Sequence, residues 1–568
     1  MNNLDIAVLF LSIGSISIYG ILRTRQRDDL TSYIKGKEQT PWWAIGLSVM
    51  ATQASAITFL STPGQGYLNG LGFIQIYFGI PIALIIISAF FVPQFHKLNI
   101  FTAYEFLENR FDRKTRLLGA FLFLLQRGIG AGLTIYAPAI VLSVIFGWSL
   151  PATIIGCGLV ATLYTVSGGT DAVTITQKYQ LAVIFAGLLT ATFILLSKLP
   201  ADLHITDTLS IAGSFHKLNA VDFSIDPTDR YTFWSGILGG SFLMLSYFGA
   251  DQSQVQRYLA GRSVRESRLG LLFNAVFKIP MQFFILFMGV LIFVFYQFQT
   301  PPLFFDAAAQ KYVTSRQEGD NLKSLDRQYK TEQRHVKEAL QTWLTAKKDG
   351  LSSTASRELN KASEASERAK SIKIKAVKEL QIRDNSIKAN DADYIFITFI
   401  LKELPHGIIG LLVAAFILAS LASKAAELNA LGTTTTIDFY NLIFNDSNEG
   451  RASLFATRLF TALWGIVAII IALFAHLSEN LIQAVNILGS IFYGVLIALF
   501  LSAFFVKSIG GRAMFWSALI TQSIVFYIYF NLSISYLWLP LIGCLICMII
   551  GVLLEKTIPP TKKLVLEV

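Results

Sequence analysis

The chain has 568 residues, of which 53% are hydrophobic and 15% are charged, against about 25% charged residues in an ordinary soluble domain. So few charges cannot cover the surface of a water-soluble protein of this size, and 3 cysteines exclude a disulfide scaffold. The composition therefore predicts a polytopic membrane protein. The net charge of +10 does not indicate a nucleic-acid partner, because residues 301–390 hold 18 basic and 12 acidic residues and carry most of the excess.

Thirteen apolar segments are long enough to cross a bilayer as helices, since a crossing needs about 20 residues. They are residues 3–22, 43–66, 71–95, 117–146, 150–167, 176–198, 232–251, 269–297, 407–436, 453–475, 480–504, 511–530 and 534–554. Basic residues gather in the short loops after odd-numbered spans, such as Arg110 and Arg113 after the third. Because basic loops stay in the cytoplasm, we expect the N-terminus outside the plasma (inner) membrane and the C-terminus inside.

A hydrophilic insert at 301–392 separates the eighth and ninth spans, on the outer side in this topology. Leu322, Tyr329, Val336 and Trp343 repeat every seven residues before Asp349-Gly350 interrupts the pattern. The repeat predicts two amphipathic helices folded back as a hairpin. This hairpin either contacts an extracytoplasmic protein or is a solvated segment with no role of its own.

Two predicted spans are unusually polar or rich in small residues. Residues 50–64 (MATQASAITFLSTPG) carry six hydroxyl or amide side chains and end in Pro-Gly, and the seventh span contains Gly236, Gly239 and Gly240. Interruptions five spans apart are typical of an inverted five-plus-five repeat whose first helices are discontinuous in mid-membrane. In the seventh span, small residues that only let helices pack closely are the alternative.

Three stretches of the sequence resemble the sodium:solute symporter family, whose members share a LeuT-like fold. They are SGGTDAV at 167–173, leading to Gln177 and Gln180; GADQSQVQRYL at 249–259; and the ninth span from Ala414 to Ser423, followed by Asn429 and Asp438. The resemblance covers roughly residues 40–510. It implies that the protein is a transporter and not an enzyme. Such a transporter would move a sugar, polyol, sugar acid or monocarboxylate inward, with sodium as its coupling ion and no other cofactor.

The resemblance also implies a sodium site formed by the backbone carbonyls of Ala51, Ala54 and Ala419 and the Ser423 hydroxyl. Sodium prefers several neutral oxygens, and an unwound helix exposes such carbonyls. Two departures from the family reduce the ligand set. Ala422 stands where a second hydroxyl is usual, and Gln177 stands where some members have an acidic residue of a second sodium site. One sodium is therefore expected.

Lys424 follows Ser423 directly, and Glu427 lies one helical turn further on. A lysine deep in a bilayer is costly unless it is paired, so an internal Lys424–Glu427 ion pair is one interpretation. The alternative is that Lys424 competes with or replaces the cation, which makes transport proton-linked or uncoupled.

The predicted solute site lies beside the interrupted second span and includes Gln53, Ser55 and Thr58, with Gln75 in the third span as a weaker candidate. Arg127 either binds a substrate carboxylate through its guanidinium fork or is a structural residue held by a carboxylate. With Ser55 and Thr58, Arg127 resembles the arrangement in sialic-acid members of the family. Lys278 in the eighth span allows the same two interpretations.

The predicted organisation follows the repeats. A first helix and loop occupy 1–42, the first repeat 43–198, the start of the second repeat 199–300, the insert 301–392, the rest of the second repeat 393–504, and two final helices with a tail 505–568. The predicted surroundings are the lipid bilayer and a small solute. A transporter-like sensor or adaptor that binds its partner through the hairpin is the alternative from another functional class.

Overall fold

The computed structural model describes residues 1–24, 40–98, 100–314, 320–383, 390–444, 451–475 and 479–557. Every regular element in these residues is a helix. The first half contains α1 (Asn3–Thr24), α3 (Trp42–Gln53), α4 (Ala56–Asn69), η1 (Gly70–Tyr77), α5 (Ile80–Ile86), η2 (Ile87–Phe91), α6 (Val92–Leu98), α7 (Ala103–Arg110), α8 (Arg113–Phe146), α9 (Leu150–Ser197), α10 (Ile205–Ser214), η3 (Ser235–Gly239), α11 (Gly240–Gly249), α12 (Gln252–Leu259) and α13 (Val264–Phe298). The second half contains α14 (Ala307–Thr314), α15 (Asp320–Lys348), α16 (Ser352–Arg383), α17 (Ala392–Glu403), α18 (Ile408–Thr434), η4 (Thr435–Tyr440), α19 (Asn441–Phe444), α20 (Arg451–Phe474), α21 (Leu481–Phe505), α22 (Gly511–Asn531), η5 (Tyr536–Trp538) and α23 (Leu539–Thr557).

Nine helical segments among the described residues are long and apolar enough to cross a membrane, and three shorter apolar helices accompany them. This confirms the predicted all-helical polytopic class. The segment Ala56–Leu98 holds parts of both the second and third predicted spans, and α9 holds the fifth and sixth. The number of thirteen crossings and the domain boundaries remain predictions.

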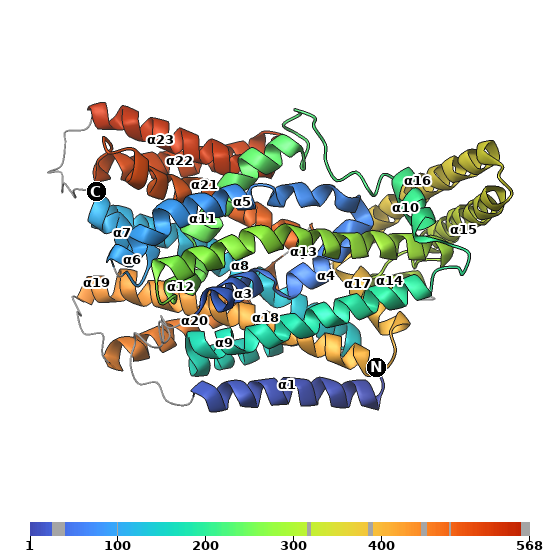
Figure 1. The fold of residues 1–568 in the computed structure, drawn as a ribbon, viewed down its shortest axis with the longest axis horizontal. Helices are drawn as coiled ribbons and strands as arrows, with labels where there is room; N and C mark the ends of the chain where they lie inside the picture. The colour runs from blue at the N-terminus through green and yellow to red at the C-terminus, as the bar shows by residue number, and fades with distance from the viewer. Residues whose placement is uncertain are drawn as a thin grey trace.

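The long helices lie roughly along one direction and form a bundle (Figure 1). In this view α1 lies along one side of the bundle and α22 and α23 along the other. The long helix α13 passes very close to α4: a Cβ added at Gly289 would lie 2.0 Å from the carbonyl oxygen of Pro63. Only glycine permits this approach between the two helices.

In the described part of the chain, the second and the seventh predicted spans, five spans apart, each contain a break between two α-helices. The first interruption lies at Ala54 and Ser55, between α3 and α4, whereas Pro63 and Gly64 continue as part of α4. The second lies at Ala250 and Asp251, between α11 and α12. The second interruption thus lies at the end of the glycine-containing stretch of the seventh span, directly after Gly249, and not at Gly236, Gly239 or Gly240.

The glycine run of the seventh span serves close packing instead. A Cβ at Gly236 would lie 2.2 Å from the Gln75 carbonyl oxygen, and one at Gly239 would lie 2.0 Å from that of Leu537. The run itself continues as a π-helical turn directly into α11. Small residues therefore bring this helix against its neighbours, which is the alternative considered for this span.

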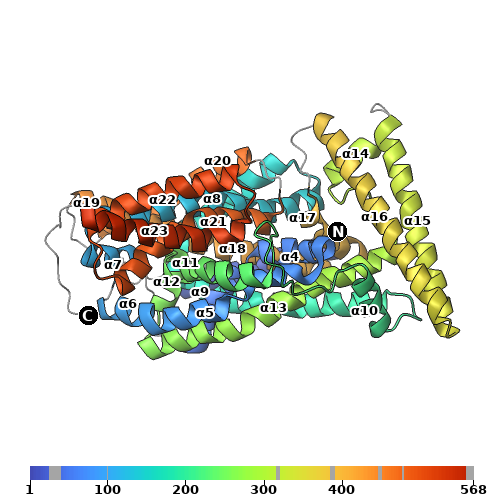
Figure 2. The ribbon, with the colours of Figure 1, turned by 90° about the horizontal axis from the view of Figure 1, so that it is seen from above.

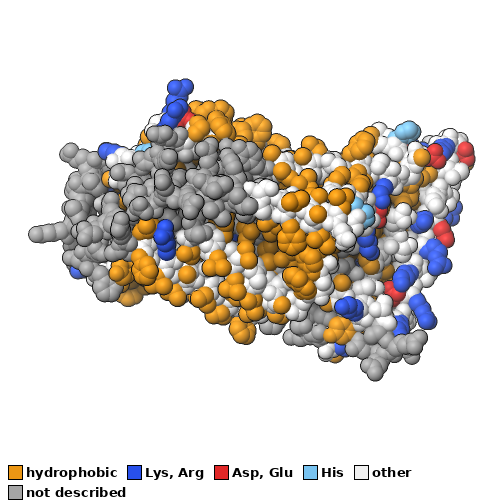
Figure 3. Space-filling view, turned by 90° about the horizontal axis from the view of Figure 1, so that it is seen from below, with side chains coloured by type: hydrophobic (Ala, Val, Ile, Leu, Met, Phe, Trp, Pro, Cys, Tyr) orange, Lys and Arg blue, Asp and Glu red, His pale blue; other side chains and the backbone are white. Residues whose placement is uncertain are grey.

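The hydrophilic insert forms the predicted hairpin. Helices α15 and α16 project beyond one end of the bundle (Figure 2), and Gly350 turns the chain between them with φ +72°. The short helix α14, which the sequence pattern did not reveal, packs with the base of the hairpin through Ala309 and Val313. A surface view shows apolar side chains over the middle of the bundle and charged side chains gathered at the hairpin end (Figure 3).

The hairpin is fixed to the bundle by polar contacts. Lys347 pairs with Asp207 of α10, and the Lys348 ammonium lies 2.8 Å from an Asp202 carboxylate oxygen. The backbone nitrogen of Phe305 donates to Asp391 at 2.8 Å, which joins the two ends of the insert. The insert is thus a docked part of the fold.

Candidate functional site

The interruption between α3 and α4 creates a polar surface inside the bundle. Ala54 (φ −81°, ψ 57°) and Ser55 (φ −70°, ψ 173°) leave the helical conformation, so the last carbonyls of α3 lose their usual intrahelical partners. The Thr58 hydroxyl donates to the Gln53 carbonyl at 2.9 Å. The Ser423 hydroxyl donates to the Thr52 carbonyl at 3.2 Å, which links the interruption to α18.

The predicted sodium ligands surround this point. Ala51, Ala54 and Ala419 line one small void of about 10 Å³, together with Gln180 and Ala422. That volume suits a single small ion or water molecule. Ser423, the fourth predicted ligand, is not in the lining of this void; it lines the larger neighbouring void together with Thr52. The side chain of Gln177 lies outside the described residues.

A second void, which we call the central cavity, lies next to the same interruption and has a volume of about 110 Å³. Its lining includes six predicted site residues: Gln53, Ser55, Thr58, Arg127, Ser423 and Glu427. It also includes residues that the sequence left unassigned: Tyr77, Gln126, Tyr247, Gln282 and Tyr493. Helices α3, α4, α8, α11, α13, α18 and α21 therefore meet here.

Four charged side chains form a buried network at one wall of the central cavity; we call Arg127, Asp251, Lys424 and Glu427 the charge quartet. Arg127 contacts Asp251, and its Nη1 lies 3.4 Å from Glu427 Oε1. Lys424 contacts the Ala131 carbonyl and the Thr134 hydroxyl, and its Nζ lies 3.2 Å from Glu427 Oε2. The geometry favours the ion-pair interpretation for both Lys424 and Arg127.

The uncharged side chain of Tyr493 bridges two members of the charge quartet. Its hydroxyl donates to Asp251 at 2.6 Å and accepts from Arg127 Nη2 at 3.0 Å. Asp251 also caps α12 by accepting from the Ser253 backbone nitrogen at 3.0 Å. The sequence motif containing Asp251 was visible, but nothing in the sequence indicated that it faces Arg127.

Lys278 of α13 lines the central cavity and is 2% exposed. Its ammonium lies 5.9 Å from the centroid of the Tyr77 ring, and within the described part of the chain it forms no ion pair. The amide nitrogen of Gln53 is also buried without a hydrogen-bond partner in those residues. The cavity therefore offers a cation and a hydrogen-bond donor that no acceptor of the described chain occupies.

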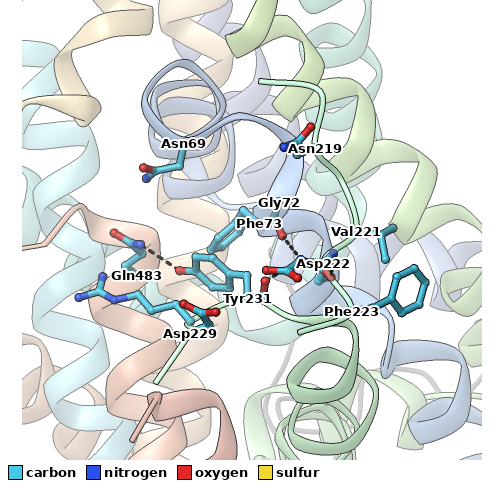
Figure 4. Close-up of a pocket in the computed structure, with 12 residues that line it drawn as sticks. Asn69, Gly72, Phe73, Asn219, Val221, Asp222, Phe223, Asp229, Tyr231 and Gln483 are labelled. Carbon is cyan, nitrogen blue, oxygen red and sulfur yellow. Dashed lines mark hydrogen bonds between the residues drawn. The ribbon is translucent and has the colours of Figure 1, made fainter. Parts of the chain in front are cut away.

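Gln75 lies away from the central cavity. Its amide nitrogen donates to the Tyr231 carbonyl at 2.7 Å, and its amide oxygen accepts from the Asp222 backbone nitrogen at 2.9 Å. These contacts place it in the wall of a wider cavity of about 750 Å³, which we call the vestibule (Figure 4). With both ends of its amide engaged, Gln75 holds the 219–231 loop in place.

Comparisons with known proteins agree with this architecture. The sodium/iodide cotransporter of Homo sapiens is 32% identical over 291 residues, which are 51% of this chain and 44% of that protein. Sodium-coupled monocarboxylate transporter 1 of Xenopus laevis is 33% identical over 48% of this chain and 43% of that protein. The chain thus spans less than half the length of these curated relatives.

A solved Na⁺-coupled sialic acid symporter, in a substrate-bound outward-open state, has a similar fold, with a TM-score of 0.75 and 22% identity over 99% of this chain and 100% of that chain. The sequence model of the sodium:solute symporter family matches residues 33–322 and 379–521. Since this match covers most of the chain, the protein belongs to the sodium:solute symporter family.

Proposed function

We propose that the protein is a sodium-coupled symporter of a small organic anion, which it moves across the plasma membrane by alternating access. The observation that supports an anionic solute is Lys278, a buried cation in the central cavity without a carboxylate partner in the described chain. Arg127 and Lys424 are already neutralised by Asp251 and Glu427. An anionic solute would neutralise Lys278 in the same way.

The proposed sodium ligands are the carbonyls of Ala51, Ala54 and Ala419 and the Ser423 hydroxyl. Their void adjoins the interruption of the α3–α4 helix, and Gln53, Ser55 and Thr58 on that interruption line the central cavity. Sodium binding would fix the unwound backbone and thereby order the solute site. This shared element is our proposed basis of coupling.

Relatives support both parts of the proposal. Iodide and monocarboxylates, named for two relatives, are small anions whose transport is sodium-coupled in those proteins. Gln53 and Gln282 line the cavity and carry a buried donor and a buried acceptor without partners in the described chain, which suits a hydroxylated carboxylate. In the proposed topology the hairpin end of the bundle faces outward, and uptake runs from that end.

Uptake into proteoliposomes tests the proposal. A panel of radiolabelled lactate, pyruvate, iodide, glucose and myo-inositol is offered with and without an imposed sodium gradient. We expect sodium to stimulate uptake of at least one anion and of neither neutral solute. Stimulated uptake of glucose or myo-inositol alone would refute the anion assignment.

Variants then separate the two sites. Lys278→Gln should raise the KM for the anion at least tenfold, whereas Lys402→Gln, which removes an exposed lysine of α17, should not change it. Ser423→Ala should raise the sodium concentration for half-maximal uptake. If sodium stimulates no flux in the wild-type protein, the coupling proposal fails while the fold stands.

A further inference from the structure

A third cavity lies between the hairpin and the bundle, and we call it the junction cavity. Its volume is about 530 Å³, within the range of small-molecule sites. One side is formed by Tyr67, Phe215 and Phe293 of the bundle end, and the other by Ile374 and Val377 of α16. It is separate from the central cavity, with which it shares none of its lining residues.

Cations outnumber carboxylates in this cavity. Its lining includes the lysines Lys217, Lys370, Lys373 and Lys378 and the carboxylates Glu367 and Asp391. Lys373 pairs with Asp391 at 2.9 Å, and Lys370 lies 3.6 Å from Glu367. Within the described chain, Lys217 and Lys378 form no ion pair, so two positive charges of the cavity are uncompensated there.

Lys217 is held in place. The turn that follows α10 has His216 at φ +57°, a conformation rare for a non-glycine residue. The Lys217 ammonium donates to the Leu68 carbonyl at 2.5 Å and lies 4.6 Å from the centroid of the Phe293 ring. Two of its three donor positions are left for other acceptors.

Two residues of this lining, Gln297 and Gln333, carry buried acceptors without partners in the described chain. The amide oxygens of Gln297 and Gln333 form no hydrogen bond in the described chain, although both residues are less than a tenth exposed. The Gln297 amide nitrogen donates a hydrogen bond to the Phe293 carbonyl at 3.0 Å. Buried acceptors normally have partners, and a rotation of either amide toward the cavity would let its oxygen accept a hydrogen bond from a ligand there.

We propose that the junction cavity is a second binding site, for a small organic anion that also carries a hydroxyl or amide N–H group. Lys217 and Lys378 bind the anionic group, Gln297 and Gln333 accept the hydrogen bond, and the aromatic side chains contact the carbon skeleton. Asn69 lines both this cavity and the vestibule, so a bound anion lies beside the vestibule. The site goes beyond the proposed transport cycle and does not depend on sodium.

The titration of Lys217 supports the assignment. Burial, together with the charge of Lys370, lowers the pKa of Lys217 to about 8, while Glu367 acts in the opposite direction. The other titratable groups of the lining are Lys373, Lys378, Asp391, Tyr67 and Tyr329. An anion bound next to Lys217 raises its pKa again, so binding near pH 8.5 must be accompanied by proton uptake.

The full-length protein in nanodiscs of zwitterionic lipid is the material for the test, and mandelate in sodium-free buffer is the probe. Mandelate combines a carboxylate, a hydroxyl and an aromatic ring. Phenylacetate lacks the hydroxyl and mandelamide lacks the charge, so both should bind at least tenfold more weakly. Calorimetry at pH 8.5 in buffers of different ionisation enthalpy measures affinity and proton uptake together.

Lys217→Met and Lys378→Met should each weaken mandelate binding roughly tenfold, and Lys217→Met should abolish the proton uptake. Lys375→Met is the matched control, because Lys375 is an exposed lysine of the same helix α16 that does not line the cavity. Lys217→Arg should retain binding, which separates loss of charge from loss of fold.

Equal mandelate affinity in the wild-type protein and both lysine-to-methionine variants would overturn the proposal. Loss of mandelate binding in nanodiscs that contain phosphatidylglycerol would also overturn it, because the cavity would then be a site for lipid headgroups. Sodium-independent binding that persists while the protein shows no sodium-stimulated uptake would refute the transport function and leave this site standing.

Discussion

Replacement of Lys424 by methionine removes one charge from the quartet while keeping most of the side-chain volume. The Lys424 ammonium lies 3.2 Å from Glu427 Oε2, and at an effective dielectric constant of about 20 that pair attracts by about 5 kcal/mol. Arg127 and Thr134 still contact Glu427 in the variant, the latter at 2.9 Å. We therefore expect Lys424→Met to lower the free energy of unfolding by about 3 kcal/mol, the lower end of the cost of breaking a buried pair.

The double variant Lys424→Met/Glu427→Gln supplies the decisive measurement. It removes both charges, so its stability should return to within about 1 kcal/mol of the wild-type protein. Steric trapping in bicelles measures these free energies, and the apparent Tm in detergent ranks the variants. If the double variant is as unstable as the sum of the two single variants, the two side chains are not coupled and the reasoning fails. Measured on the same proteins, an unchanged sodium dependence of uptake in Lys424→Met would exclude its competition with the cation.

Three further predictions concern packing, pH and coupling. Gly289→Ala should sharply reduce the folded yield, judged by size-exclusion chromatography, because its Cβ would lie 2.0 Å from the Pro63 carbonyl oxygen; Gly156→Ala, with nothing within 4 Å, is the control and should fold normally. Because burial lowers the pKa of Lys217 to about 8, the unfolded chain binds more protons above that pH. The contribution of Lys217 to the free energy of unfolding should thus rise between about pH 8 and pH 10.4. If the wild-type protein and the Lys217→Met variant show the same dependence of this free energy on pH, the prediction is contradicted. Ser423→Ala should raise the half-maximal sodium concentration for uptake without lowering protein yield, and an unchanged value would remove Ser423 from the proposed sodium site.

Much of the fold follows from local patterns in the sequence. Apolar length predicts the membrane helices, and the heptad of Leu322, Tyr329, Val336 and Trp343 predicts α15, where all four side chains are buried. Helix interruptions are harder to place. The Pro63-Gly64 pair resembles the end of a helix, but α4 continues through both residues. Helix α13 packs closely against this regular helical segment.

The sequence predicts those residues of the candidate site that belong to one short motif, the polar stretch around the α3–α4 interruption. Gln53, Ser55 and Thr58 lie on one interruption and reach the central cavity together. The roles of Arg127 and Gln75 depend on partners far along the chain, Asp251 and the 222–231 loop. Such long-range pairs are set by tertiary packing, and no periodicity or composition in a single sequence reports them.

The neutrality of the charge quartet has a consequence for the electrical behaviour of the transporter. Two positive and two negative side chains that move together carry no net charge through the membrane field, where each elementary charge is worth about 2.3 kcal/mol per 100 mV. Lys278, neutralised by a bound monoanion, adds none either. In the proposed cycle the empty carrier returns with the uncompensated charge of Lys278, so one complete cycle moves the sodium charge minus the charge of the anion, and the reversal potential of the transport current measures that difference.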